Sequence, residues 1–230
     1  MRKQLDTIIS RLKGRDYRLD ERIPSSYLLR LALSRAMMRM RGMLSGIKNE
    51  GSLFIGKRVT LKARALMRVG KGVTVHDKSY IDALSTEGIV FGNNVSAGRN
   101  TKIECTGNLQ QVGKGMKVGN DVGLGSDNFF GAAGGIEIGD DCILGNFISF
   151  HSENHRYRDP ATPIRLQGVT RTGIRIGKNC WIGSKVTILD GVDIKDGCVI
   201  AAGSVLRAGV YEADGIYGGV PAVFIKKRIG

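Results

Sequence analysis

Hydrophobic residues recur every six positions in the C-terminal third of the chain, and this period excludes most folds. From Ile176 onward, six successive positions at this spacing are aliphatic: Ile176, Ile182, Ile188, Ile194, Ile200 and Leu206. A second, mostly small or aliphatic residue follows each of them four positions later: Cys180, Val186, Val192, Cys198, Ser204 and Val210. A six-residue period fits neither a helix nor a long alternating strand. It is typical of short strands joined by tight turns, where glycine and asparagine supply left-handed backbone.

Looser versions of the same spacing extend the pattern toward the N-terminus. They include Val112, Val118, Leu124, Ile138, Leu144 and Phe150, and before them Ile55, Leu61, Val69, Val75, Ile81, Phe91, Ala97 and Ile103. One coil cannot bury its own apolar face, so stacked coils must supply the core. We therefore predict an all-β chain with a parallel β-helix over residues 49–217. Cys142, Cys180 and Cys198 occupy second small positions and are expected in its core.

The spacing fails between Phe150 and Ile176, which are 26 positions apart. The segment 152–174, "SENHRYRDPATPIRLQGVTRTGI", has no apolar period, and such long excursions are usually functional or disordered. Two of the three histidines, His151 and His155, stand where it begins. Histidine titrates near neutral pH and suits general-base work. We expect His155 to be a catalytic base at the mouth of a loop; a plain surface histidine is the alternative.

Five short motifs accompany the repeat: "GGIEIG" (134–139), "HSENH" (151–155), "NCWIG" (179–183), "AAGSV" (201–205) and "GGVPA" (218–222). Together they resemble the hexapeptide-repeat acyltransferases, and within them the maltose and galactoside acetyltransferase branch. The likeness is strongest to the polysaccharide O-acetyltransferases of that branch. The resemblance implies a left-handed parallel β-helix, a triangular prism of hexapeptide coils. It also implies a homotrimer that holds acetyl-CoA in the groove between two subunits.

The resemblance further implies roles for single residues. The histidine that matches His155 is the general base, and the tryptophan that matches Trp181 lines the site near the acetyl group. The lysine that usually follows the "AAGSV" motif is Ala208 here, so Arg207 is expected to replace it. Small residues let the pantetheine arm approach the backbone, and those expected to do so are Gly183, Ser184, Gly203 and Ser204. A basic cluster near the C-terminus, Lys226, Lys227 and Arg228, is a candidate to bind the CoA phosphates.

Auxiliary residues are expected near the loop. A carboxylate beside a catalytic imidazole can fix its tautomer, which makes Glu153 a candidate. His151 is expected to point outward near the mouth of the site, where it would contact the acceptor or the thioester. Asn146, Asp127 and Asn128 lie on the preceding turns and are candidates to face the groove.

These observations predict direct transfer of an acetyl group from acetyl-CoA to a sugar hydroxyl, in surface or capsular polysaccharide or O-antigen biosynthesis. Direct transfer is expected because no serine or cysteine of the motifs is paired with a base. N-acetylation of an amino sugar nucleotide is the alternative within this class.

Two other classes of function compete with acetyl transfer. A zinc lyase like the γ-carbonic anhydrases needs three histidine ligands, but His76 lies 75 positions before His151, so no metal is expected. A non-catalytic scaffold, which would bind no acetyl-CoA, is the third possibility.

Residues 1–48 form a basic segment outside the repeat. They hold 12 Lys and Arg residues against four Asp and Glu residues, a net charge of +8 within the chain's +14. Pro24–Ser26 suits a helix start, and we predict a helix from there to Ser45–Gly46. Its apolar stripe is Leu29, Leu33, Met37, Met40 and Leu44. An earlier, shorter helix is expected from the spacing of Leu5, Ile8, Ile9 and Leu12.

Two positions for this segment stay open. The helices either cap the prism or pack at the trimer interface, or they rest on an acidic membrane that carries a lipid-linked glycan acceptor. No nucleic-acid-binding module is recognisable. Because neither a signal peptide nor a long apolar run is present, we expect a cytoplasmic protein, at the inner face of the membrane if the helix binds lipid. Residues 218–230 are expected to form a basic C-terminal tail.

Overall fold

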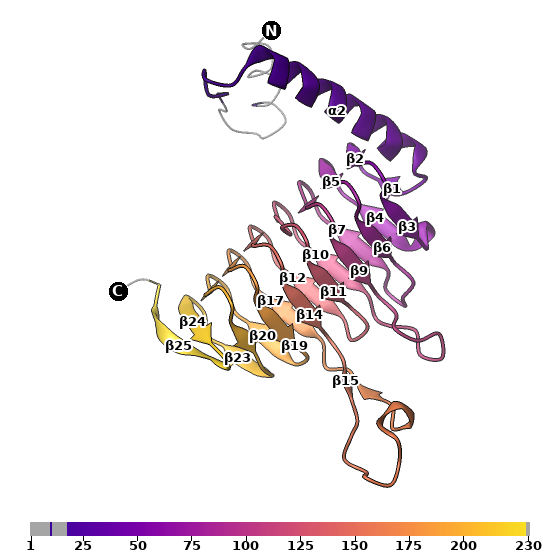
Figure 1. Ribbon diagram of the computed structural model, residues 1–230, viewed down its shortest axis with the longest axis vertical. Coiled ribbons are helices and arrows are strands. Elements are labelled where there is room, and N and C mark those ends of the chain that lie inside the picture. The colour runs from indigo at the N-terminus through magenta and orange to yellow at the C-terminus, as the bar shows by residue number, and fades with distance from the viewer. Residues whose placement is uncertain (1–9, 11–17, 229–230) are drawn as a thin grey trace.

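The structure, a computed structural model, describes residues 10 and 18–228 and is a three-sided β-solenoid with one long helix at its N-terminal end (Figure 1). The first face stacks eight parallel strands. They are β1 (Lys48–Asn49), β4 (Met67–Val69), β7 (Ile89–Phe91), β10 (Met116–Val118), β12 (Ile136–Ile138), β17 (Ile174–Ile176), β20 (Val192–Ile194) and β23 (Gly209–Tyr211).

The second face has two parts, joined through bridges from Gly123 to Ser96 and Ile143. The first part is β2 (Leu53–Ile55), β5 (Val73–Val75) and β8 (Ser96–Ala97). The second part is β13 (Ile143–Leu144), β18 (Trp181–Ile182), β21 (Val199–Ile200), β24 (Gly215–Gly219) and β25 (Ala222–Lys227). β25 runs antiparallel to β24, whereas the other pairs on this face are parallel.

The third face is parallel throughout. Its seven strands are β3 (Thr60–Lys62), β6 (Tyr80–Asp82), β9 (Lys102–Glu104), β11 (Phe129–Gly131), β14 (Ser149–His151), β19 (Thr187–Leu189) and β22 (Val205–Leu206). A separate antiparallel pair, β15 (Asn154–His155) with β16 (Val169–Thr170), lies in the long loop after β14. Of two 3-10 turns, η1 (Arg64–Leu66) lies in the prism and η2 (Ile164–Leu166) lies in the long loop.

The repeating aliphatic positions form the core, as predicted. Ile188 on β19 pairs in register with Phe150 on β14, and Phe150 pairs with Phe130 on β11. All three are fully buried, and the two phenyl rings stack with centroids 4.7 Å apart. Each coil thus places a like residue on its neighbour, which removes the inner column of the third face from water.

Two predicted inward positions are wrong. Val112 and Val210 are 42% and 56% exposed. Val112 lies in the loop between β9 and β10, where the six-residue spacing is interrupted before it resumes at Val118. Val210 pairs with Asp193, a residue in the middle of β20 that faces outward, so Tyr211 takes the inward place instead.

Asparagine and aspartate side chains connect successive coils at the corner between the first and second faces. Asn93 Oδ1 accepts a hydrogen bond from Lys71 N, Asn120 Oδ1 accepts one from Asn93 N, and Asp140 Oδ1 accepts one from Asn120 N, each at 2.8 Å. The preceding glycines allow this stacking, since a Cβ on Gly92 would lie 2.7 Å from the backbone of Gly119. The corner therefore needs a glycine followed by a short polar side chain.

Asn128 belongs to the core and does not face a groove, which corrects the prediction made from the sequence. Its side chain is 1% exposed, and its Nδ2 donates to the carbonyls of Leu124 and Gly145, while its Oδ1 accepts from Ile148 N at 2.7 Å. An asparagine is favoured at this buried position because the turn leaves one N–H group and two C=O groups without backbone partners, and its side chain binds all three. Asp127 is held in the same turn, where its Oδ1 accepts from Asn100 Nδ2 at 2.7 Å.

The helix α2 spans Ser25–Leu44, close to the predicted bounds. It packs on β2, and a Cβ on Gly42 would lie 1.9 Å from the carbonyl oxygen of Leu53. Arg35 donates to Thr74 Oγ1 at 3.0 Å and lies over the Phe54 ring. Within the described chain, no helix has the length and apolar character needed to cross a membrane. The shorter helix expected around Leu5–Leu12 lies outside the described residues.

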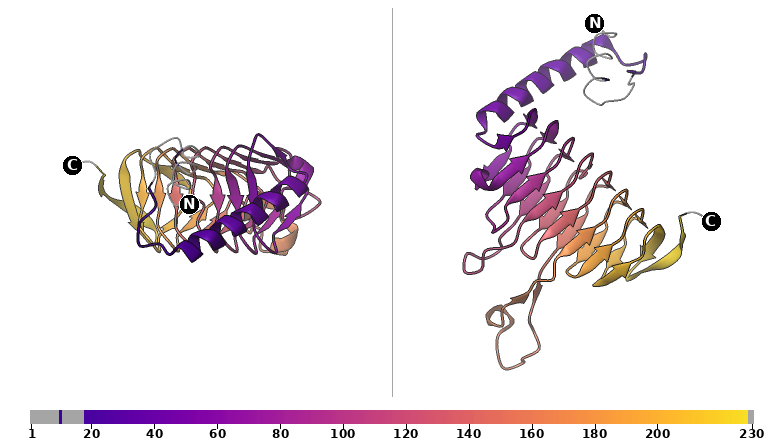
Figure 2. Two further views of the ribbon diagram at one scale, coloured as in Figure 1. Left: turned by 90° about the horizontal axis from the view of Figure 1, so that it is seen from above. Right: turned by 180° about the vertical axis from the view of Figure 1, so that it is seen from behind.

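The C-terminal segment, expected from the sequence to form a basic tail, folds back as a strand at the end of the prism. β25 pairs with β24, and the ring of Tyr217 lies 5.0 Å from Tyr211 and 5.6 Å from Phe224. The view from behind shows this hairpin at one end of the coil stack and α2 at the other (Figure 2).

Replacing Asn128 by alanine removes three hydrogen bonds from a buried turn and leaves their backbone partners without a polar contact. We expect Asn128→Ala to lower the stability of the fold by about 2–4 kcal/mol. Asn146→Ala is the matched control, because Asn146 is exposed and its side chain accepts one hydrogen bond, from Ser126 N. Thermal melting followed by circular dichroism compares the two variants, and an equal melting temperature for both would contradict the structural role of Asn128.

Candidate functional site

The longest loop between strands of the prism leaves the corner between the third and first faces. β14 ends at His151, the loop leaves the prism, and β17 resumes the first face at Ile174, in agreement with the predicted interruption (Figure 1). His155 lies on β15 opposite Val169 of β16, and Arg156 N donates to Gly168 O at 3.0 Å. The base of the loop is therefore a short hairpin that presents an exposed His155 beside the prism.

Ser152 fixes the start of the loop. It is fully buried, its Oγ donates to Gly131 O at 2.7 Å, and it accepts from Gly134 N at 2.8 Å. A Cβ on Gly134 would lie 1.8 Å from Ser152 O, so this glycine is required for the close contact. The contact explains why "GGIEIG" and "HSENH" occur together in the sequence.

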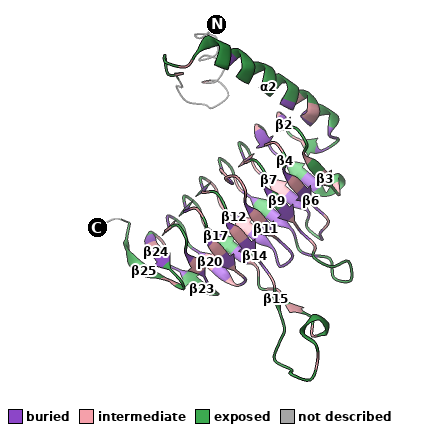
Figure 3. Cartoon of the chain, viewed as in Figure 1, coloured by how far each residue is buried: buried purple, intermediate pink, exposed green. Residues whose placement is uncertain are grey.

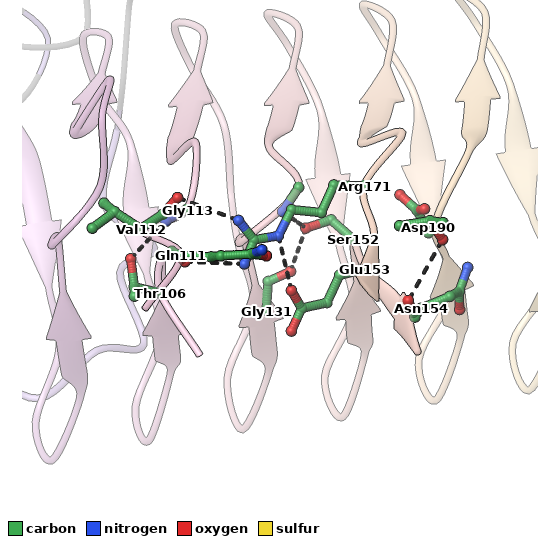
Figure 4. Close-up of polar contacts among 12 residues, drawn as sticks. Thr106, Gln111, Val112, Gly113, Gly131, Ser152, Glu153, Asn154, Arg171 and Asp190 are labelled. Atoms are coloured by element: carbon green, nitrogen blue, oxygen red, sulfur yellow. Dashed lines mark hydrogen bonds and ion pairs between the residues drawn. The ribbon is translucent and has the colours of Figure 1, made fainter. Parts of the chain in front are cut away.

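Arg171 fixes the return strand of the hairpin. Its Nε lies 3.0 Å from Glu153 Oε2, and its terminal nitrogens donate to Gln111 O at 3.1 Å and Val112 O at 3.2 Å (Figure 4). Both charged side chains are less than one-third exposed, which limits screening by water. Arg171 therefore ties the two ends of the loop to each other and to the loop between β9 and β10.

Asp190 holds the same return segment from the other side. It is 4% exposed and accepts from Thr172 N at 3.0 Å and Gly173 N at 2.7 Å. A buried carboxylate is tolerated here because backbone amides satisfy it. Arg171 and Asp190 are functional candidates that sequence reasoning missed; their only signal was their position beside the break in the repeat.

The predicted pairing of Glu153 with the catalytic imidazole is wrong. The Glu153 carboxylate lies on Arg171, because both side chains point to the same side of the loop base (Figure 4). It therefore positions the loop and does not orient the imidazole. His151 points outward as expected: it is exposed, and its ring centroid lies 5.7 Å from that of Phe129.

The residues expected to bind the donor lie on a different part of the prism. Trp181 is 57% exposed on the second face, where it pairs with Ile143 and Val199. Ser184 lies at the next corner, and its Oγ accepts from Asn146 N at 3.2 Å. These residues gather on the second face and its corner with the third, whereas His155 lies at the corner of the third with the first.

Two predicted donor contacts are structural. Ser204 is buried, its Oγ donates to Ala201 O at 2.6 Å and it accepts from Gly219 N at 3.2 Å, so its side chain cannot line an outer groove. Gly183 is also buried, and a Cβ there would lie 2.6 Å from Ala202 N, so coil stacking requires this glycine. Gly203 has a φ of +74°, a backbone conformation that favours glycine, and no atom lies within 4 Å of the position of its Cβ. The backbone conformation therefore accounts for this glycine without any ligand.

The predicted basic residues lie near the C-terminal end of the prism. Lys227 Nζ donates to Ala213 O at 2.7 Å, and Arg228 Nη1 donates to Gly197 O at 3.1 Å, so both side chains lie against the last coils. Lys226 pairs with Ile216 and is exposed, as is Arg207. The structure thus groups three of these cations on the hairpin end of the second face.

Comparison with known proteins agrees with this geometry. Residues 173–208 match the protein family described as bacterial transferase hexapeptide (six repeats). The matched segment begins where the chain returns from the long loop, and it carries the six-residue repeat that this family describes. A probable acetyltransferase of Mycobacterium tuberculosis is 30% identical over 128 residues, which make up 56% of this chain and 39% of that protein. The chain therefore spans less than half the length of this curated relative.

Solved structures share the fold. Two variants of AntD, an N-acyltransferase from Bacillus cereus, in complex with dTDP and coenzyme A, have TM-scores of 0.52 and 0.51 at 17% identity. The match covers 82% of this chain and 89% and 88% of those chains. At this identity the likeness concerns the fold alone.

The histidines of this chain are separated by the fold. His76 follows β5 on the second face, whereas His151 ends β14 on the third, and burial together with Arg35 lowers the pKa of His76. Among residues 10 and 18–228, no three His, Cys, Asp or Glu side chains gather as a metal ion needs. The four cysteines are buried, and burial raises the pKa of the Cys105 thiol to about 12.

Replacing Arg171 by methionine should release the hairpin that carries His155, because the bond to Glu153 and the two bonds to the loop between β9 and β10 are lost. We expect amide hydrogen exchange over residues 153–170 to become about 10-fold faster or more. Arg175→Met is the matched control, since Arg175 is 68% exposed and lies 3.8 Å from Glu137 on the first face. Mass spectrometry of proteolytic peptides measures both, and unchanged exchange in Arg171→Met would contradict the anchoring role.

Proposed function

We propose that this protein transfers an acetyl group from acetyl-CoA to a hydroxyl group of a sugar, with His155 as the general base. The observation that carries the proposal is the hairpin at the base of the loop, which holds an exposed imidazole beside a rigid prism and is fixed by Arg171, Ser152 and Asp190. The curated relative named as a probable acetyltransferase supports the same reaction class.

The chemistry requires one proton to move twice. His155 takes the proton from the acceptor hydroxyl as its oxygen bonds to the acetyl carbonyl carbon. The imidazolium then returns this proton to the departing sulfur as the carbon–sulfur bond breaks. No covalent enzyme intermediate is needed, and the buried cysteines are unsuited to form one.

The second face supplies the donor side of this proposal. The exposed ring of Trp181 offers apolar contact, and Ser184 offers a hydroxyl near the next corner. Lys226 and Lys227 on β25 carry positive charge of the kind that the CoA phosphates require. The AntD variants, which were solved with coenzyme A, have the same fold.

The acceptor would enter from the loop. Residues of the loop line an open hollow of ≈ 1220 Å³, with His155, Tyr157 and Gln167 among them. A sugar fits such a mixed surface of hydroxyl, amide and aromatic groups. We place this sugar in the biosynthesis of a surface polysaccharide, in the cytoplasm.

Transfer to an amine is the second candidate, because AntD is described as an N-acyltransferase. The same imidazole could take a proton from an ammonium or amine acceptor. The products separate the two: an O-acetyl ester is cleaved by hydroxylamine, whereas an N-acetyl amide resists it.

The separation of the two groups of residues on one chain supports a homotrimer. His155 and Trp181 lie at different faces, so a neighbouring copy can bring one group against the other. A cyclic assembly places the same two surfaces together at every interface.

Replacing His155 by alanine should lower turnover at least ~100-fold, the low end of a general base's usual contribution. Acetyl-CoA binding, measured by titration calorimetry, should be retained, because the donor residues lie on another face. His151→Ala is the matched control and should cost less than about 10-fold. A His155→Ala protein with full turnover, or with no acetyl-CoA binding in either form, would reject the proposal.

Mixing two inactive variants tests the shared site. His155→Ala and Trp181→Ala subunits, unfolded and refolded together, should regain about one quarter of the sites, because random assembly pairs an intact His155 with a neighbour's intact Trp181 at this frequency. Each variant refolded alone should stay inactive. Absence of recovery in a mixed assembly confirmed by native mass spectrometry would place the whole site in one chain.

A further inference from the structure

The face of α2 that points away from the prism is apolar. At 3.6 residues per turn, one side of the helix gathers seven side chains without a charged group between them; they are Leu29, Leu33, Ala36, Met37, Met40, Met43 and Leu44. The buried residues Leu28, Met38 and Gly42 lie on the opposite side. The apolar stripe predicted from the sequence is therefore not used to bind the prism.

These side chains are open to solvent. Leu33 is 59% exposed, Met37 and Met40 are 46% exposed, Met43 is 68% exposed and Leu44 is 78% exposed. Figure 3 shows the exposed residues running along α2 beyond its contact with β2. A continuous row of apolar side chains on a surface that faces water marks an interaction site.

The charges of α2 indicate the chemistry of the partner. The helix contains four arginines and no acidic residue. Arg30 and Arg41 border the apolar face on one side and Arg39 on the other, when the helix is drawn at 3.6 residues per turn. Arg35 lies toward the prism, where it contacts Thr74. An apolar face with basic borders matches an anionic lipid surface, which accepts apolar side chains below its charged headgroups.

The first face of the prism offers no comparable partner surface. Residues 49–230 carry a net charge of +6, so a second copy would bring further positive charge toward the arginines. The outward column of the first face alternates in sign through Lys117, Glu137, Arg175 and Asp193. That face is polar and ion-paired, whereas α2 leaves its apolar residues uncovered. Nucleic acid would match the arginines but leave the leucine and methionine side chains in water.

We propose that the outward face of α2 docks on anionic membranes, with its axis in the plane of the headgroups. The apolar side chains insert into the acyl boundary, and Arg30, Arg39 and Arg41 contact lipid phosphates. The prism is then held at the membrane through its N-terminal end. This assignment concerns binding and does not depend on the acetyl-transfer reaction.

Flotation of the full-length protein with vesicles tests the docking. Vesicles of equal parts phosphatidylglycerol and phosphatidylcholine should carry the protein upward, and vesicles of phosphatidylcholine alone should carry at least about 10-fold less. The double variant Leu33→Glu/Met40→Glu should lose flotation by at least about 10-fold, since two charges would enter the acyl region. Replacing Arg30 and Arg39 by glutamine should weaken partitioning about 5-fold for each arginine.

The control places one new negative charge elsewhere. Leu109 is 79% exposed in the loop between β9 and β10, and Leu109→Glu should float like the unmodified protein. Analytical ultracentrifugation without vesicles should show the same assembly mass for the double variant and the unmodified protein. No flotation of the unmodified protein, equal flotation of the double variant, or a smaller assembly mass for it would overturn the proposal. The last result would assign this face to contact between copies.

Discussion

Stacking of one coil on the next is the interaction on which the rest of this molecule depends. Strands of two or three residues cannot form a core alone, so Ile188 is buried only because Phe150 and Leu206 lie in register on either side. The backbone follows the same rule at the corners, where Asn93, Asn120 and Asp140 each bond to the coil before them. The fold is therefore nearly one-dimensional, and a local change should be felt mainly by adjacent coils.

This regularity determines where a reactive side chain can be held. Outward side chains on a flat face lie side by side in register, so they enclose no hollow. The chain gains a concave surface by leaving the stack after His151, and it keeps that excursion in place with groups from neighbouring coils. Gly131, Val112 and Asp190 come from different coils, yet all bind the base of one loop. These bonds thus fix the hairpin that carries His155 to the rigid prism.

The sequence predicts the coil because every coil needs apolar residues at its inward positions, and this requirement recurs many times along the chain. Ile176 and Ile200 are buried for one reason, and a single exception would hardly alter the pattern. Errors appear where the repeat is interrupted or ends, at Val112 and Val210, since the period alone does not show which residue resumes the inward column. The loop was predictable as an interruption, whereas the partner of Glu153 was not. The ion pair with Arg171 depends on a return strand 18 residues later, which no periodic signal places.

The two end coils of the prism are covered in different ways. The C-terminal coil is covered by its own hairpin, in which Tyr217 packs between Tyr211 and Phe224. The N-terminal coil is covered by α2, but a helix has two sides, and only the side with Met38 and Gly42 is needed for the cover. A helix that served only as a cap would carry polar residues on its outer side, as the outward column of the first face does. The apolar outer side of α2 therefore requires a second surface, and the arginines along its borders make an anionic one the best match.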